Sequence, residues 1–156
     1  MTTHRSVPPA QTGQSVAAAS SGSRTYNRQG NSTVTTTQEQ NKKNVKEYWI
    51  EVLQNQRVEL IPKLLAANYK FNGQPASVED NTKFVASLHE QYPGFTYIIY
   101  DLIAEGEQVA IRWRLVAPAT ATRGAGYCLG ANLITGSGGK GVSNWQVSEP
   151  FTPDAN

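Results

Sequence analysis

The spacing of apolar residues changes once along the chain, from a helical period to an alternating one. Before residue 95, apolar side chains recur every three or four positions in three runs, a pattern that predicts three helices. These runs span residues 45–53, 58–65 and 78–88. Thr37 and Gln40 have the spacing of a capping box and are expected to start the first helix, while Ser77 is expected to cap the third.

The second helix is expected to be short and to lead into a turn. Pro62 fits only in the first turn of a helix, and we expect this helix to end about Asn68. Residues 69–71 then predict a brief strand. Asn72 and Gly73 follow that strand and form a pair that is typical of tight turns.

Beyond residue 95 the pattern predicts two long hairpins. Residues 95–104 and 109–115 are expected strands, joined by a turn between them. After a loose segment, residues 127–134 and 140–147 are expected to form the second hairpin around a glycine-rich turn. Three helices followed by hairpins predict an α+β fold in which a curved antiparallel sheet wraps the helices.

Residues 1–36 lack any apolar period and are rich in Ser, Thr, Gln, Asn and Gly. Such a segment buries too little apolar surface to offset the entropy lost on ordering, so we expect a disordered tail. Its arginines and its lack of acids also fit a transit peptide, although Pro8, Pro9 and Gly13 oppose the amphipathic helix of such peptides. The globular domain is expected over residues 37–150, with residues 151–156 as a short extension.

The charge of the chain is unevenly distributed. The formal net charge of +2 includes three arginines before Glu39, where there is no acid, so the remainder holds 11 basic and 12 acidic residues. A nearly neutral domain without a clustered basic face argues against nucleic acid as a partner. No run of 18 apolar residues and no basic amphipathic stretch points to a membrane. We therefore expect a cytoplasmic protein that binds neither.

Few residues of the domain carry reactive chemistry. The single cysteine, Cys128, excludes a disulfide within the chain and a thiolate cluster, and no metal site is expected. We expect a buried, inert thiol rather than a nucleophile paired with His89. The run GSGGKG lacks the spacing of a phosphate-binding loop and predicts a hairpin turn. Asp101 has two interpretations, a buried carboxylate beside Ile99 and Ile103 or the partner of an arginine across the hairpin.

Three segments of the chain resemble a known family. They read NVKEYWIEVLQNQRVELIPKLLAANYKFNG, FVASLHEQYPGFTYIIYDLIAEGEQVAIRWRL and, more loosely, GGKGVSNWQV, and together they run from about Asn41 to Glu149. The helix pair before a polar-Gly turn, the helix closed by an aromatic-Pro pair and the acidic-Gly turn between strands are similar to those of SnoaL-like polyketide cyclases. The resemblance implies a nuclear transport factor 2-like cone, in which helices and a bent sheet enclose a pocket.

The resemblance also implies where catalysis would take place. A cyclase of this family uses a carboxylate whose pKa is raised by apolar surroundings, with a histidine near it. These positions fall on Gln146 and Asn132, and a polar residue of the first strand falls on Asn72. All three are carboxamides, which donate and accept hydrogen bonds but do not move a proton at neutral pH. We therefore expect Gln146→Asp to raise any proton-transfer activity.

Five residues are expected to contact a ligand in the implied pocket. They are Asn72, His89, Tyr92, Trp113 and Trp145. His89 has a second interpretation as a partly exposed residue of the third helix. The two tryptophans have a second interpretation as core of the sheet, a role that overlaps with the first because the walls of such a pocket are mostly apolar.

Two functions follow from the resemblance. The first is a cyclase or isomerase of polyketide or related metabolism that needs no cofactor, acts on a small apolar molecule and uses amide donors to polarise a carbonyl. The second is a non-catalytic module of the same fold for ligand binding or dimerisation. The family implies a homodimer through the open sheet face. An adaptor for other proteins is disfavoured, because the exposed strand positions are expected to be polar, as at Arg112 and Arg114.

Overall fold

The first helical segment changes type midway along its length. The computed structural model describes residues 36–155, in which α1 (Thr36–Glu47) continues directly into the π-helical segment η1 (Tyr48–Gln54). α1 begins one residue before Thr37, the position expected to cap it. Four apolar side chains of η1 are buried in the core, and they are Tyr48, Trp49, Val52 and Leu53. Of the predicted disordered tail, residues 1–35 lie outside the described residues, and Thr36 already belongs to α1.

The second helix gives way to a strand earlier than its apolar spacing predicts. A 3-10 turn, η2 (Val58–Leu60), leads into α2 (Ile61–Leu64), with Pro62 in the first turn as expected. β1 (Leu65–Phe71) follows at once, so the helix does not reach Asn68. The reason is tertiary, since β1 pairs in parallel with β6 (Lys140–Ser148). The predicted turn at Asn72 and Gly73 is confirmed, with φ of 47° and 82°, and it leads into β2 (Gln74–Pro75).

α3 (Val78–Gln91) begins with the predicted cap at Ser77. The Ser77 hydroxyl accepts a hydrogen bond from the Asp80 backbone amide at 3.1 Å, and the Asp80 carboxylate accepts one from the Ser77 amide at 2.8 Å. This reciprocal capping box satisfies two of the amides that a helix start leaves free. One face of the helix, with Asn81, Val85 and Leu88, is buried.

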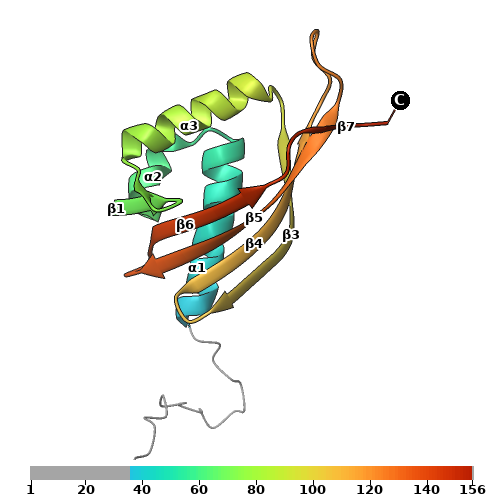
Figure 1. The fold of residues 1–156 in the computed structure, drawn as a ribbon. Helices are drawn as coiled ribbons and strands as arrows, with labels where there is room; N and C mark the ends of the chain where they lie inside the picture. Colours follow the sequence, from blue (N-terminus) through green and yellow to red (C-terminus); the bar gives the residue numbers. More distant parts are fainter. Residues whose placement is uncertain (1–35, 156) are drawn as a thin grey trace, which may run out of the picture. The chain divides into compact units, whose positions relative to one another are not determined.

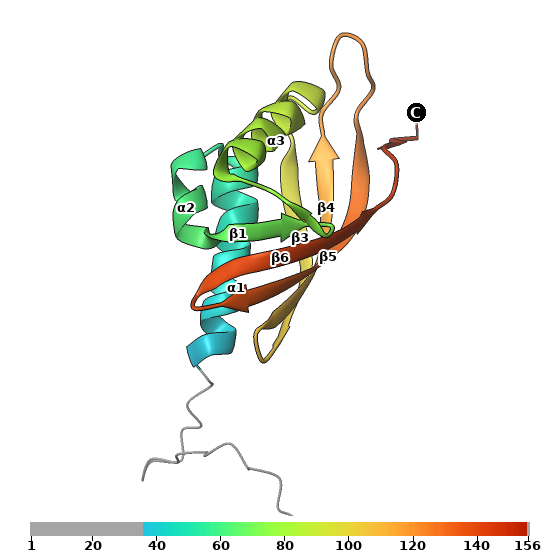
Figure 2. The same ribbon diagram turned by 60° about the vertical axis from the view of Figure 1, so that its left-hand side comes forward.

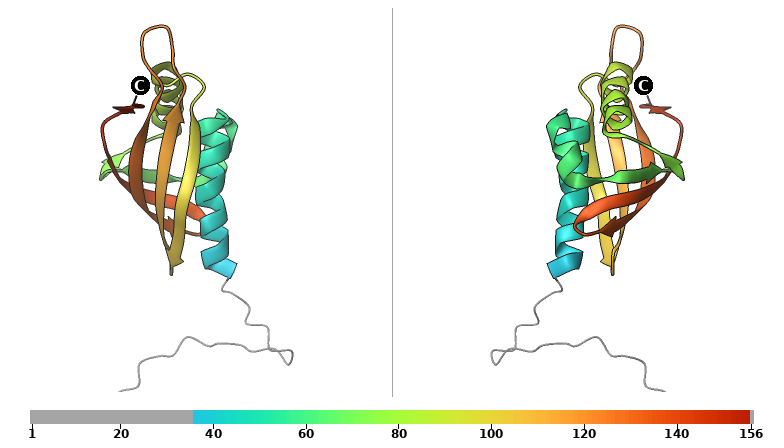
Figure 3. Two further views of the ribbon diagram at one scale, coloured as in Figure 1. Left: turned by 90° about the vertical axis from the view of Figure 1, so that its right-hand side faces the viewer. Right: turned by 90° about the vertical axis from the view of Figure 1, so that its left-hand side faces the viewer.

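The strands form one sheet whose inner face is covered by the helices (Figure 1). The remaining strands are β3 (Thr96–Glu105), β4 (Gln108–Ala117), β5 (Gly126–Ser137) and β7 (Thr152–Pro153). Their order is β2-β1-β6-β5-β4-β3, with β7 added beside β5, and every pair except β1 with β6 is antiparallel. The two predicted long hairpins and the α+β class are confirmed. The sheet is strongly bent, so that β6 runs steeply across the direction of β3 and β4 (Figures 2 and 3).

Trp113 fills the centre of the inner face of the sheet. Its side chain is 4% exposed and packs edge-on against Tyr97, with ring centroids 5.3 Å apart. On β5, Gly130 is its cross-strand partner. A Cβ placed on Gly130 would lie 2.2 Å from the six-membered ring of the indole. The absence of a side chain at Gly130 therefore gives the indole its space.

An irregularity in β3 decides the environment of Asp101. The register of β3 against β4 shifts between Ile99 and Asp101, which leaves Tyr100 without a partner and reverses the alternation beyond it. Asp101 and Ile103 therefore lie on the outer face, where the Asp101 carboxylate forms an ion pair with Arg112. The interpretation of Asp101 as a buried carboxylate is wrong, and the cross-hairpin ion pair is confirmed.

The outer face of the sheet is more apolar than its sequence pattern predicts. Arg112 does point outward, but six large apolar side chains are also exposed on the strands. They are Ile98, Tyr100, Ile103, Leu133, Trp145 and Val147. The expectation of a polar outer face is therefore wrong. The homodimer expected through this face stays a prediction.

Three smaller expectations concern residues without a functional role. Cys128 is buried and its sulfur lies 3.7 Å from the Tyr92 hydroxyl oxygen, as expected for an inert thiol. The run GSGGKG is the turn between β5 and β6, with positive φ at Gly138 and Gly139. Within residues 36–155, no helix is both long and apolar enough to cross a membrane.

Candidate functional site

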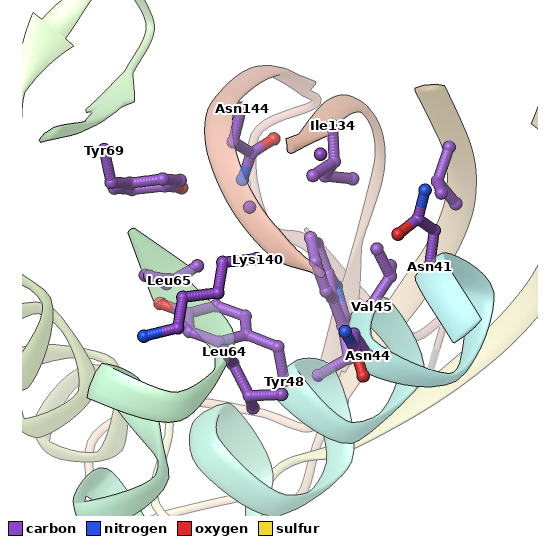
Figure 4. Close-up of a pocket in the computed structure, with 14 residues that line it drawn as sticks. Asn41, Asn44, Val45, Tyr48, Leu64, Leu65, Tyr69, Ile134, Lys140 and Asn144 are labelled. Atoms are coloured by element: carbon purple, nitrogen blue, oxygen red, sulfur yellow. The ribbon is translucent and has the colours of Figure 1, made fainter. Parts of the chain in front are cut away.

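A pocket of about 160 Å³ lies between η1, the start of α3 and the strands β1 and β6. Its walls are mostly aromatic and aliphatic, from Leu53, Phe71, Ala76 and Phe84. It adjoins a smaller space of about 30 Å³ beside the β5–β6 turn, shown in Figure 4. Four residues line both spaces and form the partition between them, namely Tyr48, Trp49, Tyr69 and Asn144.

A row of hydrogen-bonded carboxamides crosses the inner face of the sheet to this pocket. Asn132 on β5 faces Gln146 on β6, and its amide nitrogen lies 3.2 Å from the Gln146 side-chain oxygen. The same nitrogen lies 2.8 Å from the side-chain oxygen of Asn144. The Asn132 oxygen accepts a hydrogen bond from the Trp113 indole nitrogen at 2.7 Å. We call Trp113, Asn132, Asn144 and Gln146 the amide row.

The indole fixes the direction of every hydrogen bond in the amide row. An indole N–H only donates, so the Asn132 oxygen must face Trp113 and its NH₂ group must face β6. The side-chain oxygens of Asn144 and Gln146 then accept from that NH₂ group. Both residues line the pocket, so their own NH₂ groups are left for it. The row therefore presents hydrogen-bond donors at its pocket end.

Tyr69 lies beside Asn144 and adds a further hydrogen-bond donor to the pocket. Its ring and the nitrogen of Asn144 are turned toward the same space in Figure 4. Burial raises the pKa of the Tyr69 phenol to about 12, and a hydrogen bond from Asn144 opposes part of that rise. The phenol stays protonated at neutral pH, so its O–H can donate to a group in the pocket that Tyr69 lines.

The other polar groups of the pocket are already paired. The Tyr48 hydroxyl donates to the Asn81 side-chain oxygen at 3.1 Å, and burial raises the pKa of this phenol above its usual range. Asn81 in turn donates to the Ser77 carbonyl at 2.8 Å. Asp80 is the one carboxylate that lines the pocket. It is solvent-exposed, and hydrogen bonds from the Ser77 hydroxyl and amide lower its pKa, so it serves as a helix cap and not as a buried acid.

His89 and Tyr92 do not line this pocket, although both were candidates for ligand contact. His89 lies on α3, where its Nε2 donates to the Leu53 carbonyl at 2.7 Å and its Nδ1 accepts from the Gln56 amide at 3.0 Å. Both ring nitrogens are thus used to join α3 to the end of η1. Tyr92, which follows α3, stacks on Phe151 with centroids 5.7 Å apart. Each residue has a structural contact in place of a ligand contact.

The structure separates the two candidate tryptophans. Trp113 points inward and supports the amide row through its N–H, without lining the pocket itself. Trp145 is 57% exposed, because its neighbours Asn144 and Gln146 occupy the inward positions of β6 and alternate side chains face opposite sides of a strand. Trp145 therefore lies outside the pocket, with its ring close to Gly73.

Asn72 reaches the site through the backbone. Its side-chain oxygen accepts a hydrogen bond from the Gln146 backbone amide at 2.8 Å. Its backbone N–H donates to the Asn144 backbone carbonyl, also at 2.8 Å. Asn72, Asn132 and Gln146 are therefore brought together, as the sequence positions imply. Asn72 fixes the position of β6 and does not line the pocket.

Sequence reasoning missed Asn144, Tyr69 and Trp49. Asn144 lies two residues before Gln146 on the same strand, so the alternation of β6 already places both side chains on one face. Tyr69 shares a strand with Asn72, but the expected helix to Asn68 obscured which face it takes. Trp49 looks like an ordinary core residue by its helical spacing. Within residues 36–155, no group of three or more His, Cys, Asp or Glu side chains is placed to hold a metal ion.

Comparison with known proteins agrees with the architecture. The model of the family described as SnoaL-like polyketide cyclase matches residues 43–126, slightly more than half of the chain. No curated protein matches the sequence.

Several solved structures share the fold at low sequence identity. A proposed polyketide cyclase from Acidithiobacillus ferrooxidans is 20% identical, with a TM-score of 0.62 over 70% of this chain and 88% of its own. IdmH, a proposed polyketide cyclase from Streptomyces antibioticus, is 16% identical, with a TM-score of 0.61 over 70% and 92%. AclR, a proposed hydroxylase from Streptomyces galilaeus, is 17% identical, with a TM-score of 0.59 over 71% and 79%. These likenesses show the fold, and the different activities in their names show that the fold alone does not assign a reaction.

Proposed function

The chain belongs to the SnoaL-like polyketide cyclase family, and from that premise we propose that its pocket binds a small, largely apolar molecule and orients it by hydrogen bonds from neutral side chains. The apolar walls, among them Leu53, Phe71 and Phe84, supply affinity through buried surface. The amide row supplies orientation, and its fixed direction is the observation that carries the proposal. No cofactor is needed for this role.

The position of the family's acid supports binding over proton transfer. Gln146 stands there as a carboxamide whose oxygen is occupied by Asn132, and the nearby Asp80 carboxylate is committed to the cap of α3. Neither group is suited to accept a proton from a ligand at neutral pH. The pocket is thus proposed as a binding site first.

Filling the pocket with a larger side chain is expected to weaken the binding of a two-ring apolar probe strongly. We expect Ala76→Trp, which adds bulk to the wall, to weaken the affinity for 1-tetralone at least about tenfold, because the added indole takes the ligand's space. Saturation-transfer NMR and calorimetric titration on the full chain measure this affinity. Ala110→Trp makes the same change at an exposed position of β4 and is the control. Equal binding by both variants and the unaltered chain would contradict the assignment of this pocket.

The second candidate function is a cofactor-independent cyclase or isomerase. It is favoured by the donors that the pocket directs inward from Tyr69 and the amide row, because such donors stabilise the negative charge that develops on a carbonyl oxygen during enolisation. In this role the side chains would polarise the carbonyl, and a solvent or substrate base would remove the proton.

Restoring a carboxylate is expected to increase proton transfer. Gln146→Asp places a base beside the bound carbonyl compound, and we expect it to raise the rate of exchange of the α-protons of 1-tetralone with D₂O by about tenfold or more. Proton NMR follows the loss of the α-proton signal. Gln108→Asp, at an exposed position of β4, should leave the rate at the level of the unaltered chain. An equal rate for both variants would show that position 146 is not placed for proton transfer.

A further inference from the structure

Trp49 carries a buried donor that the fold leaves without a partner. Its side chain is 3% exposed, and its indole nitrogen has no hydrogen-bond acceptor among residues 36–155. Buried polar atoms in native proteins are nearly always paired, since an unpaired one loses its hydration without compensation. The missing acceptor of the Trp49 N–H therefore needs an explanation, and the space beside the indole is the place to look for it.

The position of Trp49 answers that question. It belongs to the wide helical segment η1 and lines both parts of the pocket, at the partition between them. π-helical turns are rare and often occur at functional sites. The neighbouring polar atoms of the partition, on Tyr48, Tyr69 and Asn144, do not serve the indole, because none of them lies within hydrogen-bond reach of its nitrogen.

Donors outnumber free acceptors around this space. The Trp49 N–H has no acceptor among residues 36–155, and the Tyr69 O–H and the Gln146 NH₂ group are further donors that line the same pocket. On the acceptor side are the Tyr48 oxygen, whose proton is given to Asn81, and the Asp80 carboxylate at the exposed end, which is bound by Ser77. The deep end of the pocket is therefore complementary to a group that accepts hydrogen bonds.

We infer that Trp49 donates a hydrogen bond to the ligand, and that the end of the ligand buried at the partition carries an acceptor oxygen without a proton of its own. A ketone, an ester carbonyl or an ether oxygen meets this requirement. An ammonium group does not, because it only donates hydrogen bonds and would face donors. The inference rests on the proposed binding function of the pocket, and it adds which residue reads the ligand and which chemical group is read.

A matched pair of probes and a matched pair of variants test this inference. 1-Tetralone and tetralin share a two-ring skeleton and differ in one carbonyl. Trp49→Phe removes the N–H and keeps an aromatic ring, and we expect it to weaken the affinity for tetralone roughly fivefold to tenfold more than the affinity for tetralin. Trp145→Phe makes the same change on the exposed outer face and should alter neither affinity. Calorimetric titration of the full chain gives all four ratios.

The indole resonance gives a second measurement that does not depend on the variant. In ¹⁵N-labelled protein, tetralone should shift the Trp49 indole N–H signal downfield and tetralin should not, with Trp49→Phe and Trp145→Phe assigning the signals. Equal weakening of both probes by Trp49→Phe, with no selective shift, would make Trp49 a packing wall and overturn the inference while leaving the binding function intact. Failure of the unaltered chain to bind either probe would overturn both.

Discussion

Gly130→Ala is expected to destabilise the folded chain by about 3 kcal/mol or more. The added Cβ would meet the Trp113 ring at 2.2 Å, a separation that real contacts never reach. The ring has little room to move, because it is 4% exposed and packs against Tyr97. Overpacking of a rigid core forces the backbone or the ring out of place.

Chemical denaturation of the variant measures this loss. Gly124→Ala is the control, since a Cβ there meets nothing within 4 Å, and its free energy of unfolding should stay within about 0.5 kcal/mol of the unaltered chain. In a Trp113→Leu background, which lacks the ring, the cost of Gly130→Ala should shrink markedly. An undiminished cost in that background would assign the effect to the β5 backbone and not to the indole.

Asn132→Leu is expected to cost about 2 to 4 kcal/mol of folding free energy although it keeps the size of the side chain. Leucine removes the acceptor of the Trp113 indole and the donor of both Asn144 and Gln146. The indole then holds a buried N–H without a partner, for which about 1 to 3 kcal/mol is typical. Asn144 and Gln146 line the pocket, so water in the pocket can replace part of the hydrogen bonding that they lose with Asn132.

The neighbouring position on β5 supplies the control for this change. Leu133 points outward and is 42% exposed, so Leu133→Asn should change the free energy of unfolding by no more than about 0.5 kcal/mol. Thermal and urea unfolding, followed by circular dichroism, measure both variants. A cost at Asn132 as small as that at Leu133 would mean that the amide row does not contribute to stability.

The local pattern was sufficient to predict the helices, the hairpins and the α+β class. Ser77, the Asn72-Gly73 turn and the glycine-rich turn carry their own conformational preferences, so a sequence without coordinates places them correctly. The early end of α2 and the extra residue in β3 could not be predicted in this way. Both accompany strand pairing, of β1 with the distant β6 and of β3 with its hairpin partner β4, and pairing overrides the local spacing of apolar residues.

The sequence predicted the positions of some of the expected site residues and not of others. The family positions correctly gathered Asn72, Asn132 and Gln146, because strand pairing conserves which residues face each other. His89 lies outside the pocket, and helical spacing does not reveal that its ring bonds to the end of η1. Trp145 was misplaced although strand alternation could have excluded it once Gln146 was taken to face inward.

In the proposed binding role, the fixed orientation of Asn132 sets from a distance which polar groups the amide row turns toward the ligand. A carboxamide has an oxygen at one end and an NH₂ group at the other. The end that faces one neighbour therefore decides which end is left to face the next. Trp113 does not line the pocket, and its N–H fixes the orientation of the first carboxamide, Asn132. A chain with an acceptor at that position would turn the whole series over and offer oxygens inward. In the proposed binding role, such an exchange would change the polarity that the amide row presents to the pocket without altering a residue of the cavity wall.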